Sequence, residues 1–68
     1  MIELRAIIEA VENGDQERAV QLLVEAEWLA FARGSRIGGD LAYARSCLGI
    51  NDREGALVLL RRLVGSGR

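Results

Sequence analysis

Residues 14–26 read Gly14-Asp15-Gln16-Glu17-Arg18-Ala19-Val20-Gln21-Leu22-Leu23-Val24-Glu25-Ala26, and this stretch decides the fold. Either Asn13 or Asp15 can cap the helix that follows, and the polar and acidic residues after Asp15 suit a first helical turn. The apolar residues that follow recur every three or four positions, which is the spacing of one face of an α-helix. One stripe consists of Ala19, Leu22, Leu23, Ala26 and Ala30, and a neighbouring stripe consists of Val20, Val24, Trp28 and Phe31. The stretch therefore predicts a long helix that is apolar over an unusually wide arc.

The same pattern returns 37 residues later in the chain. The positions that are identical at this offset are Leu4, Asp15, Glu17, Ala19, Leu22 and Leu23, which align with Leu41, Asp52, Glu54, Ala56, Leu59 and Leu60. The repeated unit is a helix, a turn and a helix, as in stacked helical hairpins. Convergence of two hairpins on one common pattern is the alternative explanation of this agreement.

Apolar periodicity predicts three further helices. The first covers about residues 2–12, the third begins at a cap on Asp40 and ends near Gly49, and the fourth begins at Asn51, whose spacing to Glu54 is that of a capping box. A glycine-rich loop is expected at 34–39 and a frayed tail at 65–68. No segment alternates with period two, so no strand is expected. The prediction is one all-α domain over residues 1–68, with four short helices arranged as two tandem antiparallel hairpins over about 2–33 and 39–64.

The second half of the first unit resembles the inter-helix turn and second helix of a tetratricopeptide repeat. That family carries Gly-Asp at the turn and two small residues seven positions apart, as Gly14-Asp15, Ala19 and Ala26 do here. The second unit keeps the turn, but Leu63 occupies its second small position, and the spacing of 37 exceeds the family's length of about 34. The resemblance covers about half the chain. It implies a TPR-like small helical bundle with a surface that binds peptides or proteins.

Length and composition exclude most chemistry. The chain has 68 residues, which is too short to enclose a large active site. It has no histidine and a single cysteine, so zinc sites, histidine-dependent triads and an internal disulfide are ruled out. Cys47 lies at a half-apolar helical position with no residue to activate it, and we expect it to serve packing. We therefore expect no enzyme, no catalytic residue, no cofactor, no metal and no small-molecule substrate.

Neither nucleic acid nor a membrane is expected as a partner. Nine basic and ten acidic residues leave a net charge of −1, so no nucleic-acid binding is expected. No run of apolar residues is long enough to cross a bilayer and the start does not resemble a signal peptide, so we expect a cytoplasmic protein that does not bind membranes.

Residues 1–40 carry four arginines and eight acids (−4), whereas residues 41–68 carry five arginines and two acids (+3). These opposed halves favour antiparallel self-association, and ordinary solvated helix faces are the alternative.

The chain contains no lysine, histidine, proline or threonine, and all its basic residues are arginine. Two explanations fit so narrow a composition. One is a natural protein with a strong arginine bias, and the other is a de novo designed sequence filled with helix formers.

Four consecutive apolar residues, Trp28 to Phe31, point around most of one helix. We expect Leu22, Leu23, Leu59 and Leu60 to form the core, which leaves surplus apolar surface on the second helix unless the third and fourth helices wrap it. The candidate interface residues are Trp28, Phe31, Val24 and Tyr43. The function expected is a non-enzymatic protein–protein interaction or scaffold module that associates with itself as a homodimer. The alternative is a designed helical protein with no activity beyond folding or assembly.

Overall fold

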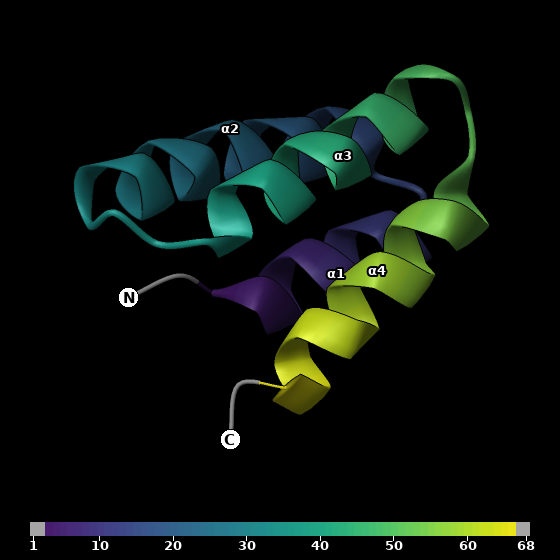
Figure 1. Ribbon diagram of the computed structural model, residues 1–68. Coiled ribbons are helices and arrows are strands. Elements are labelled where there is room, and N and C mark those ends of the chain that lie inside the picture. Colours follow the sequence, from purple (N-terminus) through teal and green to yellow (C-terminus); the bar gives the residue numbers. More distant parts are fainter. Residues whose placement is uncertain (1–2, 67–68) are drawn as a thin grey trace.

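The computed structural model describes residues 3–66 and contains four α-helices in that range, with no strand (Figure 1). They are α1 (Leu4–Glu12), α2 (Gln16–Ala32), α3 (Ile37–Gly49) and α4 (Arg53–Ser66). This confirms the prediction of an all-α fold with four short helices.

The helices form a small bundle in which each helix contacts two others. Consecutive helices pack against each other, and α1 also packs against α4. Figure 1 shows α2 and α3 side by side as one layer, with α1 and α4 forming the layer beneath them. The contact between α1 and α4 covers surface that an open stack of two hairpins would leave exposed. The surface available to a partner is therefore the outer face of the bundle, because α1 and α4 already cover each other.

The two turns inside the hairpins have the same geometry. Asp15 N–H donates to the Ala10 carbonyl over 2.9 Å, and Asp52 N–H donates to the Cys47 carbonyl over 2.8 Å. These are the hydrogen bonds of a helix that ends in the left-handed conformation, which Gly14 adopts at φ 77° and Asn51 at φ 67°. Both turns therefore end one helix and start the next within three residues.

Each turn is followed by an aspartate cap. Of the two predicted caps of α2, Asp15 is the one used: its carboxylate accepts from Arg18 N–H at 3.3 Å, and the Asp52 carboxylate accepts from Gly55 N–H at 3.0 Å. The prediction that Asn51 caps the fourth helix is wrong. Asn51 takes the left-handed position of the turn, which asparagine tolerates better than most residues, and so the cap moves to Asp52.

The connection between α2 and α3 is shorter than the predicted loop at 34–39, and Asp40 is not the cap of α3. The helix begins at Ile37, whose N–H donates to Ser35 Oγ over 3.4 Å, and Gly38 and Gly39 lie in its first turn. A Cβ on Gly38 would lie 3.6 Å from the Ala30 Cβ, at ordinary van der Waals distance, so this turn of α3 packs directly against α2. This packing outweighs the low helix propensity of glycine.

The fourth helix extends to Ser66, past the predicted end at 64, and so the backbone of residues 65 and 66 belongs to a helix rather than to a frayed tail. The predicted first helix and first unit begin at residue 2, and the tail ends at 68. Residues 1–2 and 67–68 lie outside the described part of the chain.

The core consists of closely packed small and branched side chains. Ala19 and Ala56 have no exposed surface, which agrees with the expected close approach of the helices. Leu23 and Leu60 are fully buried as predicted, whereas Leu22 and Leu59 are only partly buried and lie at the edge of the core. The other buried residues are Ile7, Ala10, Val11, Ala26, Ala30, Leu41, Ala44, Cys47 and Leu48.

Candidate protein-interaction surface

Helix α2 buries one apolar stripe and exposes the other. The buried stripe contains Leu23 and three alanines, whereas the exposed stripe includes Trp28 and Phe31, which are 70% and 81% exposed. Val24, one turn before Trp28, is 37% exposed. The third and fourth helices therefore do not wrap the surplus apolar surface of α2. We call Val24, Trp28 and Phe31 the α2 seam.

The α2 seam forms one wall of an open groove of about 660 Å³. The opposite wall is the first turn of α3, where Gly38 and Gly39 carry no side chains. We call this cavity the α2–α3 groove. Its lining residues are Val24, Glu27, Trp28, Phe31, Ser35, Gly38, Gly39 and Arg45. A wall of aromatic rings facing a wall of bare backbone is suited to an apolar side chain from another molecule.

An ion pair crosses between the two helices at the groove. Arg45 Nε donates to Glu27 Oε2 over 2.6 Å, and Arg45 Nη2 donates to Glu27 Oε1 over 3.1 Å. This fork-like geometry holds the guanidinium in one orientation. The hydrogen bond that Arg45 donates to Glu27, together with the negative charge of that carboxylate, raises the pKa of Arg45 above its usual value. The ion pair gives the groove one polar edge.

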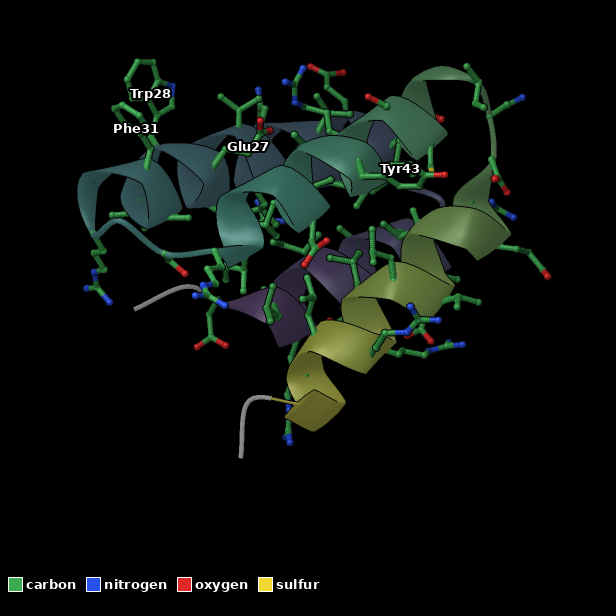
Figure 2. All side chains as sticks on the ribbon, in the orientation of Figure 1. Glu27, Trp28, Phe31 and Tyr43 are labelled. Atoms are coloured by element: carbon green, nitrogen blue, oxygen red, sulfur yellow. The ribbon has the colours of Figure 1, made fainter. Side chains whose placement is uncertain are left out.

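The labelled side chains in Figure 2 separate the predicted interface residues into two places. Trp28 and Phe31 lie next to each other on α2 and project away from the bundle, and Glu27 lies farther along, towards α3 (Figure 2). Tyr43 lies on α3, well away from that pair, and does not line the groove (Figure 2). It is 66% exposed. The structure thus brings together Val24, Trp28 and Phe31 and leaves Tyr43 apart from them.

The structure adds five groove residues that the sequence did not indicate: Glu27, Ser35, Gly38, Gly39 and Arg45. The sequence predicts a loop at Gly38 and Gly39, although two adjacent glycines also leave room for a side chain from another element or molecule. Glu27 and Arg45 are 18 residues apart, so no local spacing signals their ion pair. Only the packing of α3 on α2 places them together.

Other candidate chemistry is limited. Cys47 is a buried free thiol, in keeping with a packing role. Within residues 3–66, no cluster of three or more acidic or cysteine side chains is placed to hold a metal ion. In the same range, none of the helices is both long and apolar enough to cross a membrane.

Comparison of the chain with protein-family models, with curated protein sequences and with solved structures gave no match.

Proposed function

We propose that this chain is a non-enzymatic protein–protein interaction or scaffold module that forms a homodimer through the α2 seam. The observation that carries the proposal is the exposure of Trp28 and Phe31 beside each other on a helix whose opposite face is completely buried. Exposed aromatic side chains that adjoin a groove are typical of binding sites, since tryptophan and tyrosine often supply most of the binding energy of an interface.

The second hairpin serves as an internal comparison. At the offset of 37, the inner positions of α2 and α4 carry the same residues, for example Ala19 with Ala56 and Leu23 with Leu60. At the outer positions the helices differ: Val24 and Trp28 of α2 align with Arg61 and Gly65 of α4. A helix in this bundle therefore does not need apolar residues on its outer face. The apolar residues of the α2 seam call for another explanation, and binding supplies one.

The groove supports a helix as the bound element. A groove between two helices accepts an amphipathic helix, whose apolar residues enter it one turn apart. A second copy of the chain offers such a helix in α2 itself. The resemblance of residues 14–26 to a tetratricopeptide repeat is compatible with protein binding. A reducing compartment such as the cytoplasm suits the free thiol of Cys47.

The test is the mass in solution of the parent chain and of Trp28→Glu, measured by light scattering over micromolar concentrations. We expect the parent to approach twice the chain mass of 7.4 kDa and Trp28→Glu to remain at the chain mass. Val58→Glu is the matched control, because Val58 is 56% exposed on α4, away from the groove. This control should dimerise like the parent.

Two results would contradict the proposal. A folded Trp28→Glu variant that still dimerises would place the interface elsewhere. A parent chain that is monomeric throughout the range would remove the homodimer and favour the alternative of a designed protein that only folds.

A further inference from the structure

Each copy of the chain carries one protruding aromatic side chain and one open groove. Phe31 is 81% exposed, more than any other large apolar residue in the described part of the chain. Across the groove, nothing lies within 4 Å of the point where a Cβ on Gly39 would be. The first turn of α3 therefore leaves space that a side chain from outside can enter. In a dimer with a two-fold axis, the aromatic side chain of each copy can fill the groove of the other copy, so the same contact forms twice.

We infer that two copies pair antiparallel along α2, so that Phe31 of each copy enters the α2–α3 groove of the other beside Gly39. This inference depends on the homodimer proposed above and specifies its geometry. The α2 seam has the spacing that a helix pair requires, because residues 24, 28 and 31 are separated by four and three positions. In an antiparallel pair centred between Trp28 and Phe31, Val24 lies opposite the end of the partner's α2, where the chain continues to Ser35.

The charges along α2 distinguish the two possible directions. Residues 16–27 contain three glutamates and one arginine, a formal charge of −2, whereas Arg33 and Arg36 after the helix give +2. An antiparallel pair places each basic end beside the acidic part of its partner, and a parallel pair places like charges together. The helix dipoles also favour the antiparallel direction. Charge and shape therefore select the same arrangement.

The first test fills the groove without changing the α2 seam. Gly39→Leu adds a side chain in open space and replaces glycine with a better helix former, so the monomer should stay folded. We expect it to raise the dimer Kd at least about 30-fold, because one substitution overfills both grooves of the dimer. Gly49→Leu is the matched control: it makes the same change at the other end of α3, also in open space. The control should keep the Kd of the parent.

The second test reads the direction of pairing by disulfide formation between Val24→Cys and Ser35→Cys chains. We expect a cross-link when the two variants are mixed and oxidised, and none within either variant alone. In the antiparallel pair, each copy of residue 24 lies between five and six helical residues from the centre of the pair, so the two copies are separated by about 16 Å, which is too far for a disulfide. Cys47 is buried and does not compete.

The outcomes separate this inference from the proposed function. If Trp28→Glu is monomeric but Gly39→Leu still dimerises like the parent, the seam is the interface and the groove is not used. Cross-links within each single variant, with none between them, show a parallel pair and overturn the inference as well. If Trp28→Glu dimerises, or if the seam binds a different protein and the parent is monomeric, the homodimer itself fails.

Discussion

Truncation of Leu23 tests whether the buried residues that the two hairpins share determine the stability of the bundle. Leu23 has no exposed surface and lies in the main core, whereas its neighbour Leu22 is only partly buried at the edge of that core. Leu23→Ala should lower the free energy of unfolding by about 2–5 kcal/mol, since the truncation removes buried methyl groups and leaves a cavity. Leu22→Ala should cost about 1 kcal/mol, because part of its side chain already contacts water.

These magnitudes are large for a chain of this size. A domain of 68 residues is typically stable by about 3–10 kcal/mol, so Leu23→Ala removes a large share of the total. The two variants make the same chemical change at adjacent positions of α2, and helix propensity therefore cancels between them. A difference of about 2 kcal/mol corresponds to roughly 8–16 °C in Tm.

Urea denaturation followed by circular dichroism measures both free energies. The measurement uses a Trp28→Glu background, because dimerisation would add a concentration-dependent term to the apparent stability. Equal losses in the two variants, or a larger loss for Leu22→Ala, would show that the buried face of α2 has been assigned incorrectly.

Three further substitutions test the packing and the turns. Ala56→Leu should cost about 1–3 kcal/mol by overfilling a position with no exposed surface, while Ala32→Leu at an exposed position should be neutral in the same thermal melts. Asp52→Ala removes the carboxylate that accepts from Gly55 N–H and should cost about 0.5–2 kcal/mol in urea denaturation, and a loss near zero would argue against its role as a cap. Asn51→Val places a β-branched residue at φ 67° and should cost about 1–2 kcal/mol, whereas Asn51→Gly should cause no loss in that assay.

Local sequence patterns predicted the parts of this fold that depend on neighbours in the chain. Periodicity predicted the four helices, and residue type predicted the cap of α2 at Asn13 or Asp15. Two local predictions were wrong: the cap of the fourth helix at Asn51, and the loop that includes Gly38. Asparagine suits both a cap and a left-handed turn, and only the path of the chain decides between them. Two adjacent glycines signal a loop, but Gly38 and Gly39 lie in the first turn of a helix that packs against α2, and this tertiary contact has no local signal.

The other features that the sequence did not predict depend on contacts between residues that are far apart in the chain. The closure of the bundle by α1 against α4 has no local signal, although the ion pair of Glu12 with Arg61 supports it at 2.6 Å. The sequence left open whether the third and fourth helices cover the surplus apolar surface of α2, and the exposure of Trp28 and Phe31 decides this. The groove did not follow from the sequence, since it needs the first turn of α3 to lie opposite Trp28 and Phe31. Tyr43 is predicted to lie in the same region as these residues, but its position on α3 separates it from them.

The fluorescence of Trp28 tests the central claim most directly, because it is the single tryptophan of the chain and lies in the α2 seam. Indole emission shifts to shorter wavelength when water is excluded from the ring. Emission and mass are measured on the same samples over one dilution series. We predict that the emission shifts to shorter wavelength in parallel with the doubling of the mass, and that both changes reverse on dilution. A mass that doubles while the emission of Trp28 stays constant, or a mass that never rises above that of one chain, would contradict the account.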